Sequence, residues 1–462
     1  MIQLYPVKWY NSIAMNEKKI VRTRFAPSPT GFLHIGGLRT ALYAYLLAKH
    51  NKGDFILRIE DTDKKREVEG SKEALQVTLK KFGLIFDELY IQSERLELYK
   101  KMAEELVKAG YAFYCQCEAK NAKDDGYSNE LRDKCRNMNH TSGAIKLKVP
   151  ENEILSYYDF IHKKEISWNS DTVYDATLLK SDGYPTYHLA AMVDDIDMKI
   201  THIIRGHDWL PSTPIHLLVF KYLGDVKPEI GHPTDILSSE TGKKLSKRRD
   251  SVFAEQFLDE GYLPEALLNF VLLLGWAPKD NRELYTLEEM VESFDIKGFQ
   301  DANPKFFREK LDWFNGQYIR NLPLEDLNSK FQIPNSKFKE LEETKQIAIT
   351  KLLQDRIKKL SDLDTLAKFF WEKPEVDKSL FEEGYKEHLE SAIEMFEKID
   401  DWNLENIGIF SLELCDRKKF SKGNFFMSLR IAITGMKFTP PINDSIIILG
   451  REETLKRLKI SI

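Results

Sequence analysis

The sequence predicts a protein in two parts, an α/β half with a parallel sheet and then a half built of helices. Near the N-terminus, an apolar strand pattern at 21–25 is followed by a turn, a helical pattern and a second strand pattern at 54–60. Strand, helix and strand within roughly 40 residues form a βαβ unit, and such units build parallel sheets. From residue 252 onward, amphipathic helix patterns dominate.

The composition is that of a globular protein from a reducing compartment. The chain has 462 residues, of which 42% are apolar and 31% charged, and a prior of about 150 residues per domain gives roughly three domains. A net charge of −5 excludes a surface that is basic all over, so RNA binding would need local basic patches. Four cysteines are too few for a disulfide scaffold and favour a cytoplasmic protein. No apolar run is long enough to predict a membrane span.

A glycine-rich loop, APSPTGFLHIGG, joins the first strand pattern to the first helix. Glycines let backbone approach a ligand closely, and a helix start offers free N–H groups and a positive dipole. An isolated HxGG would be an ordinary turn with a surface histidine. In this setting the loop suits a nucleotide, and His34 can donate to a phosphate oxygen as charge builds up. We therefore expect ATP to contact Pro27, Gly31, His34, Gly36 and Gly37.

A second loop, GKKLSKR, closes the α/β half and carries several lysines. Alone, it would be a solvated basic loop or a general nucleic-acid patch. Together, the two loops resemble the HIGH-like and KMSKS-like motifs of class I aminoacyl-tRNA synthetases. The strings TRFAPSPTGFLHIGGLRTALYAYLLAKH, RIEDTD and KLSKR resemble the bacterial glutamyl-tRNA synthetases. The similarity continues through GYPTYHLA, HIIRG and EGYLPEALLNFVLLLGW to MSLRIAITG near the C-terminus.

The resemblance implies a set of catalytic residues. Lys244 and Lys247 correspond to the two lysines of the second motif and would also bind ATP. Mobile ammonium groups neutralise phosphoryl charge as it shifts toward leaving pyrophosphate. The expected catalytic residues are therefore His34, Gly36, Lys244 and Lys247.

The resemblance also implies an activity, ATP-dependent ligation of L-glutamate to tRNA(Glu) in two steps through glutamyl-adenylate. Mg²⁺ would accompany the ATP, and the family suggests a cytoplasmic monomer with no membrane partner. The residues leave open whether tRNA(Gln) is charged as well. The alternatives are a relative that loads glutamate onto queuosine, a small-molecule nucleotidyltransferase and a silent RNA-binding protein. The helical half disfavours the first two, and intact His34, Glu60 and Arg205 disfavour the third.

Glutamate offers two carboxylates and one ammonium group, and a guanidinium can bind a carboxylate in a bidentate fork. The resemblance places Arg24 and Arg205 near the substrate, while Glu60 suits the α-ammonium. Ser28 and Tyr187 can supply neutral hydrogen bonds. Structural ion pairs for the arginines and a core position for the tyrosine are the alternatives.

Three cysteines and a histidine lie within 26 residues: Cys115, Cys117, Cys135 and His140. Zn²⁺ takes three thiolates and an imidazole tetrahedrally. The spacing is not that of a standard zinc knuckle, so buried reduced cysteines are the alternative. Similar clusters in some relatives of the family bind structural zinc, and we expect structural Zn²⁺ on these four residues.

The resemblance implies a domain plan. It comprises a Rossmann-like parallel-sheet catalytic domain at 20–99 and 182–245, an inserted acceptor-stem-binding domain with the zinc cluster at 100–181, a tRNA-stem-contact domain with the lysine loop at 246–322, and all-α anticodon-binding domains at 323–462. Residues 1–19 are an extension without the features of a signal or transit peptide, and we expect 1–14 to be dispensable. Among the helices, we expect continuous helical structure at 71–109, 338–360 and 383–399.

Overall fold

The computed structural model describes residues 20–117, 131–224, 227–245, 252–333 and 335–462. The expected extension at 1–19 and Lys247 lie outside these residues. The chain forms two compact units, the first comprising Met1–Phe257 and Leu268–Phe307 and the second Leu258–Leu267 and Arg308–Ile462. The finer domain plan stays a prediction.

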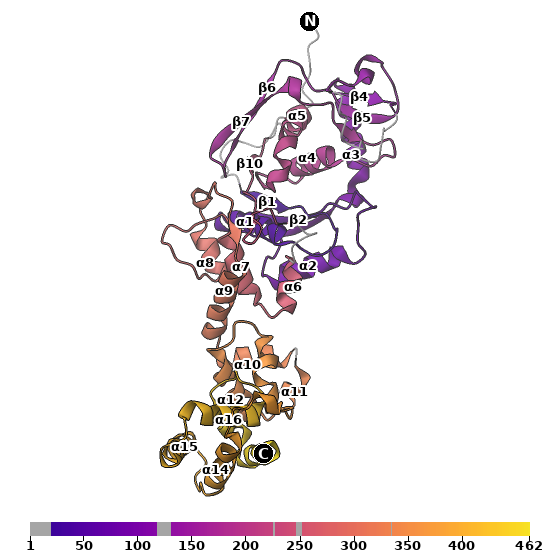
Figure 1. Ribbon diagram of the computed structural model, residues 1–462. Coiled ribbons are helices and arrows are strands. Elements are labelled where there is room, and N and C mark those ends of the chain that lie inside the picture. Colours follow the sequence, from indigo (N-terminus) through magenta and orange to yellow (C-terminus); the bar gives the residue numbers. More distant parts are fainter. Residues whose placement is uncertain (1–19, 118–130, 225–226, 246–251, 334) are drawn as a thin grey trace. The chain divides into compact units, whose positions relative to one another are not determined.

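The first unit is built on a seven-stranded sheet in the order β3-β2-β1-β9-β10-β6-β7 (Figure 1). Neighbours from β3 to β6 pair in parallel, and β6 and β7 form an antiparallel hairpin at one edge. The predicted parallel sheet is therefore confirmed. The strands are β1 (Arg22–Phe25), β2 (Asp54–Ile59), β3 (Glu88–Ile91), β6 (Ile154–Asp159), β7 (Lys164–Asn169), β9 (His202–Ile204) and β10 (Glu229–Gly231). The β6–β7 hairpin belongs to this sheet although it falls within the range expected for the inserted domain.

Two small sheets accompany the large one. They are made of β4 (Ala112–Cys115), β5 (Ala144–Leu147) and β8 (Thr177–Leu179), and of β11 (Leu237–Ser238) and β12 (Lys305–Phe306). The α-helices up to residue 293 are α1 (Ile35–His50), α2 (Ser71–Lys81), α3 (Leu96–Lys108), α4 (Tyr187–Asp197), α5 (Thr213–Leu223), α6 (Ala254–Asp259), α7 (Pro264–Leu272) and α8 (Leu287–Ser293). The 3-10 helices are η1 (Gln92–Arg95), η2 (Lys134–Asn137), η3 (Ser170–Thr172), η4 (His207–Ser212), η5 (Ile296–Gly298), η6 (Lys368–Phe370) and η7 (Lys378–Leu380).

The second unit is helical throughout its described residues, as the periodicity predicted. Its helices are α9 (Arg308–Asn321), α10 (Leu324–Gln332), α11 (Ser336–Lys339), α12 (Glu343–Gln354), α13 (Asp362–Ala367), α14 (Tyr385–Glu397), α15 (Leu404–Lys418), α16 (Lys422–Thr434), α17 (Ile442–Leu449) and α18 (Arg451–Ser461). One apolar core joins them. Arg457 of α18 enters this core and donates from Nη1 to the carbonyls of Phe369 and Ile433, at 2.9 Å each.

Two helix predictions were wrong in detail. The segment 71–109 is interrupted by β3, because Gly83 turns the chain at a φ of 72° and residues 88–91 pair with β2. A positive φ of this kind favours glycine. The segment 338–360 is two helices, because the side-chain amide of Gln346 donates to the carbonyls of Lys339 and Leu341 and stabilises a turn between them. No helix within the described ranges is both long and apolar enough to span a bilayer.

Beneath the carboxyl ends of the central strands lies a buried ion network. Arg24 of β1 and Arg58 of β2 both bind the carboxylate of Asp195 on α4, at 3.0 Å and 2.6 Å. Asp194 lies 3.7 Å from the Nε of Arg58 and accepts a hydrogen bond from the hydroxyl of Tyr99 at 2.9 Å. Buried charges need such partners, because unpaired ones cost several kcal/mol. The network therefore ties α4 to two adjacent strands.

Replacing the shared carboxylate should weaken the first unit. We expect Asp195→Asn to lower the free energy of unfolding by about 3–5 kcal/mol, because the buried guanidinium of Arg24 loses its carboxylate and that of Arg58 loses the nearest of its carboxylates. Asp54→Asn is a matched control, since Asp54 pairs with Arg22 at the surface, and it should cost less than about 1 kcal/mol. Urea unfolding followed by circular dichroism measures both. Equal costs for the two variants would contradict this account.

Candidate active site

A cavity of about 550 Å³ opens in the first unit where three adjacent parallel strands end. Residues Pro27–Gly31 follow β1, Glu60 follows β2 and Arg205 follows β9. The chain crosses from β1 to β2 on one side, while β9 lies on the other. Ligands of open α/β sheets bind at such a switch point, outside the carboxyl ends of the strands. The fold therefore offers this cavity for a ligand.

The cavity contains the predicted ATP and glutamate residues that fall within the described ranges. They are Arg24, Pro27, Ser28, Gly31, His34, Gly36, Gly37, Glu60, Tyr187, Arg205 and Lys244. Lys247, the remaining predicted residue of the site, lies outside the described residues. Residues from distant parts of the sequence thus meet in one place, and their individual roles stay predictions.

His34 is the N-cap of α1, and its Nδ1 accepts a hydrogen bond from the backbone N–H of Gly36 at 3.0 Å. Because Nδ1 accepts, the neutral ring carries its proton on Nε2, which is then a donor. A Cβ on Gly36 would lie 3.3 Å from His34 Nδ1, and one on Gly37 would lie 3.0 Å from the Leu33 side chain. The glycines therefore leave room for this cap, and the start of α1 presents a histidine and the positive end of the helix dipole to an anion.

Lys244 lies between two carboxylates that also line the cavity. Its Nζ is 2.6 Å from Asp208 and 2.8 Å from Asp235. Burial alone would lower the pKa of Lys244, but hydrogen bonds to these two carboxylates raise it above the ordinary value. The lysine is thus charged, and its partners are partly exposed groups. An arriving phosphate can compete for such an ammonium group.

Glu60 and Arg24 form the part of the wall nearest to the buried ion network. Glu60 Oε1 accepts from Arg58 at 3.1 Å, while Arg24 is held by Asp195. Burial raises the pKa of Glu60 from 4.5 to about 7, although the charges of Arg58 and Arg24 oppose this shift. Glu60 is therefore a carboxylate whose negative charge is incompletely compensated. It suits a ligand's cationic group.

Arg205 differs from Arg24 in its partners. It is 4% exposed, and its guanidinium donates to His232 Nε2, His216 Nδ1 and Thr213 Oγ1 at 3.0, 2.7 and 2.8 Å. Among the described residues, no carboxylate forms an ion pair with it. The cation is therefore oriented but uncompensated, which suits an anionic group of a ligand.

Tyr187 begins α4, and its ring stacks on Trp209 at a centroid distance of 3.9 Å. Both rings line the cavity. Trp209 is one of several site residues that sequence reasoning missed, with Asp195, Asp208, His216 and His232. The string HDWL at 207–210, which follows Arg205 and Gly206, could have drawn attention to Asp208 and Trp209. The other three are revealed only by their contacts.

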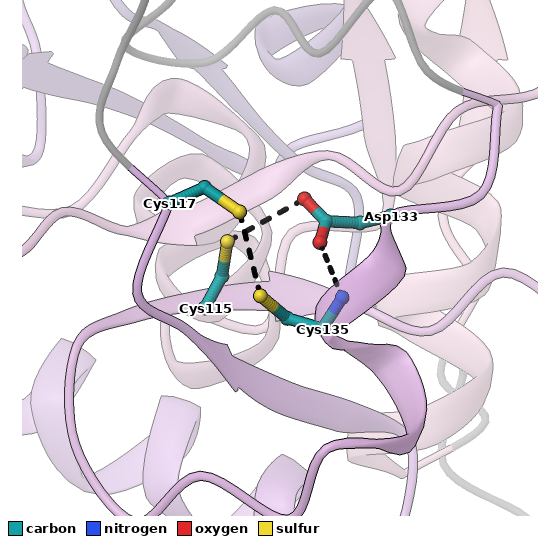
Figure 2. A group of neighbouring side chains, drawn as sticks. All are labelled: Cys115, Cys117, Asp133 and Cys135. Carbon is teal, nitrogen blue, oxygen red and sulfur yellow. Dashed lines mark hydrogen bonds between the residues drawn. The ribbon is translucent and has the colours of Figure 1, made fainter.

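The cysteine cluster lies apart from the cavity residues, around β4 and η2 (Figure 2). One ligand atom from each of Cys115, Cys117, Asp133 and Cys135 lies within 4.8 Å of the others. The Sγ atoms of Cys117 and Cys135 are 3.4 Å apart, and Cys115 Sγ is 3.4 Å from Asp133 Oδ2. Ligand atoms on a tetrahedral zinc lie roughly 3.5 Å apart. The donor set and its spacing fit a zinc ion.

The described group holds Asp133 beside the three cysteines and does not include His140, the residue predicted as the fourth ligand. Asp133 caps η2 through a 2.8 Å hydrogen bond from the Cys135 N–H, which sets its carboxylate beside the thiols. His140 comes after the end of η2 and the left-handed residue Asn139. Burial raises the pKa of the Cys115 thiol to about 12, so a bound metal would have to displace its proton.

Comparison with known proteins gives a consistent result. Residues 20–313 match a family model described as "tRNA synthetases class I (E and Q), catalytic domain", and residues 307–462 match an "Anticodon binding domain". A glutamate–tRNA ligase of Clostridium tetani is 38% identical over 97% of this chain and 98% of its own length. One of Treponema denticola is 37% identical over 96% and 99%. A crystal structure of a glutamate tRNA ligase from Elizabethkingia meningosepticum in complex with its amino acid has a TM-score of 0.84 and 34% identity, covering 96% of this chain and 99% of that one.

The raised pKa of Glu60 makes a prediction about stability. The folded protein holds the proton more tightly than the unfolded chain, so stability falls as pH rises from 4.5 to about 7. Glu60→Gln removes this ionisation. We expect it to raise the free energy of unfolding by about 1–3 kcal/mol at pH 8, with the gain vanishing toward pH 4.5.

Urea unfolding of both proteins across this pH range measures the effect. Glu88→Gln serves as the control, because hydrogen bonds from Tyr90 and Arg22 outweigh burial and lower the pKa of Glu88. It should bring no gain at pH 8. A gain from Glu60→Gln that does not vary with pH would count against an ionised, strained Glu60.

Proposed function

Since the chain belongs to the glutamate–tRNA ligase family of class I tRNA synthetases, we propose that its cavity activates L-glutamate with ATP and passes the product to tRNA(Glu). One observation carries the proposal for the site. An uncompensated cation, Arg205, an undercompensated carboxylate, Glu60, and an anion-binding helix start with His34 share a single cavity. Glutamate and ATP together present the charges that these groups complement.

The roles follow from the charges. The ammonium group of glutamate lies against Glu60, and its side-chain carboxylate lies in the fork of Arg205. The positive charge of Arg24 is already compensated by Asp195, which Arg24 shares with Arg58. Arg24 therefore attracts a second anion less strongly than Arg205 does. Glutamine would leave the buried charge of Arg205 without a partner, at a cost of roughly 2–5 kcal/mol. Rejection of glutamine therefore needs no editing step.

The reaction has two steps. The α-carboxylate of glutamate attacks the α-phosphorus of ATP, and pyrophosphate leaves with glutamyl-adenylate remaining in the cavity. Charge that builds up on the phosphates is met by His34 Nε2–H, the positive end of the α1 dipole, and Lys244 and Lys247. Mg²⁺, bound to ATP, screens the same phosphates. A ribose hydroxyl of the terminal adenosine of the tRNA then attacks the carbonyl carbon of the adenylate, so that the ester bond to the tRNA forms and AMP leaves.

The second unit supplies a surface for RNA. A cavity of about 430 Å³ there is lined by Arg356, Leu366, Met427, Arg430, Lys437, Phe438, Thr439 and Pro440. Phe438 is 87% exposed, and an exposed ring beside basic side chains can stack on a base while the cations meet phosphates. We place anticodon nucleotides here, which agrees with the family model for this half of the chain. A queuosine-loading enzyme or a small nucleotidyltransferase would need no such unit.

The cysteine cluster holds structural Zn²⁺ in this proposal, with Cys115, Cys117, Cys135 and Asp133 as ligands. The cluster ties the end of β4 to η2. Lys146 Nζ lies 2.6 Å from Asp133 Oδ2, and a lysine at this place offsets the surplus negative charge of three thiolates and a carboxylate around a dication. The metal thus supplies a strong link beside a small apolar cluster of Phe113, Cys115 and Cys135.

Pyrophosphate exchange tests the activity. The assay measures the incorporation of labelled pyrophosphate into ATP, with and without total tRNA. We expect this incorporation to require glutamate and not to occur with glutamine or aspartate. Lys244→Ala should lower kcat by about 10²–10³, because a cation at the phosphates is lost. Lys243→Ala is the control, since this exposed neighbour does not line the cavity.

Exchange with another amino acid, or none with tRNA present, would overturn the proposed activity. Identification of the charged tRNA completes the experiment. Charging purified tRNA(Glu) and tRNA(Gln) separately shows whether the second is also a substrate. Equal loss of kcat in the two lysine variants would contradict the role given to Lys244.

Metal analysis tests the zinc site. We expect about one zinc per chain in gently purified protein. Asp133→Asn should weaken zinc binding, measured by competition with a chromophoric chelator, because a neutral amide is a poorer ligand than a carboxylate. His140→Ala should leave the zinc content unchanged. Less than about 0.2 equivalents in the unaltered protein would refute the site, and zinc loss from His140→Ala alone would restore the histidine as ligand.

A further inference from the structure

Each of the three guanidinium nitrogens of Arg205 donates a hydrogen bond to an acceptor that carries no charge. Nε donates to His232 Nε2 at 3.0 Å, Nη1 to His216 Nδ1 at 2.7 Å and Nη2 to Thr213 Oγ1 at 2.8 Å. A buried arginine normally meets a carboxylate, because an uncompensated buried charge is costly. Arg24, at the same cavity, has such a partner in Asp195. The surroundings of Arg205 therefore need a separate explanation.

The ring of His232 is held in one neutral form. Its Nδ1 lies 2.8 Å from Asp159 Oδ2, which also accepts a hydrogen bond from the Tyr157 hydroxyl at 2.9 Å. The Nδ1 atom therefore carries the proton, and Nε2 is left as the acceptor for Arg205. Burial lowers the pKa of His232 to about 4, although Asp159 opposes the shift. The imidazole of His232 thus separates the negative charge of Asp159 from the guanidinium of Arg205.

His216 is held in the complementary neutral form. Its Nδ1 accepts from Arg205, and its Nε2 lies 3.1 Å from Nδ1 of His188. The proton of His216 is therefore on Nε2, donated to His188. Burial and the charge of Arg205 lower the pKa of both rings. A second proton on His216 would point an N–H at the cation, so this ring acts only as a neutral acceptor.

We propose that His216 and His232 are positioning residues for amino-acid selection, which fix the fork of Arg205 without compensating its charge and so reserve that charge for the side-chain carboxylate of glutamate. The inference rests on the proposed function. A carboxylate in place of either ring would hold the guanidinium equally well. It would also compensate the positive charge of Arg205 before the substrate binds. The preference for glutamate over the neutral glutamine would then decrease.

Three variants of similar shape at one position test this. His216→Asn keeps a neutral oxygen acceptor near the place of Nδ1, His216→Asp adds a negative charge there, and His216→Leu removes the acceptor. We expect glutamate KM to rise less than about 5-fold with Asn and at least about 30-fold with Asp and with Leu. The KM for ATP should stay near its original value in all three. The ratio of kcat/KM for glutamate to that for glutamine should fall about 10-fold or more with Asp only.

A purely structural role for the ring would give a different pattern, in which Asn and Asp have equal effects on glutamate KM and on the glutamate-to-glutamine ratio. That result would overturn the inference. If His216→Asp fails to fold, as judged by lost ATP binding and a lowered Tm, the comparison of Leu with Asn decides, and equal KM values for those two overturn it. Failure of the unaltered protein to charge tRNA with glutamate would instead refute the proposed function. The two failures are therefore distinguishable.

Discussion

The carboxylate of Asp195 is the contact on which the floor of the cavity depends. It lies between the guanidinium groups of Arg24 and Arg58, and so joins α4 to β1 and β2 in the interior of the first unit. The same helix begins at Tyr187, whose ring forms part of the cavity wall. An ion pair between two strands alone would leave α4 free to shift. A shared anion fixes all three elements at once, and the wall is set by a buried electrostatic contact rather than by apolar packing alone.

This constraint distinguishes two of the arginines that line the cavity, Arg24 and Arg205. Arg24 shares an anion and serves as part of the scaffold, whereas Arg205 is surrounded by neutral acceptors. Glu60 is the counterpart among the acids, because burial outweighs its arginine neighbours and leaves its charge undercompensated. Both Arg205 and Glu60 are costly to the free protein. Each becomes paired when a ligand of the opposite charge enters, so part of the binding free energy is the relief of these two unfavourable groups.

The sequence was sufficient for the outline of the fold and for the residues that meet in the cavity. The strand and helix periods located β1, α1 and β2, and the two motifs located His34 and Lys244, because their chemistry is carried by short contiguous strings. It failed where tertiary contacts override a local pattern. The strand β3 is set by pairing with β2, and the partners of Arg205 come from α5 and the segment after β10. Asp133 was missed for a related reason, since the position of this helix cap beside the thiols is seen only in the folded chain.

The charged groups that line the cavity differ in how readily they can exchange partners. Lys244 is paired with Asp208 and Asp235, which are 76% and 29% exposed, so a phosphate can displace carboxylates that water then solvates. Arg24 cannot change partners in this way, because Asp195 is buried too, so a carboxylate released by Arg24 would keep only Arg58 and would not be solvated. Arg205 needs no exchange at all, since its acceptors are neutral and a carboxylate adds to them. The contacts of Lys244 are thus adjustable, whereas those of Arg24 and Arg205 are fixed. That division suits an enzyme whose phosphates move during the reaction while the identity of its amino acid must not be mistaken.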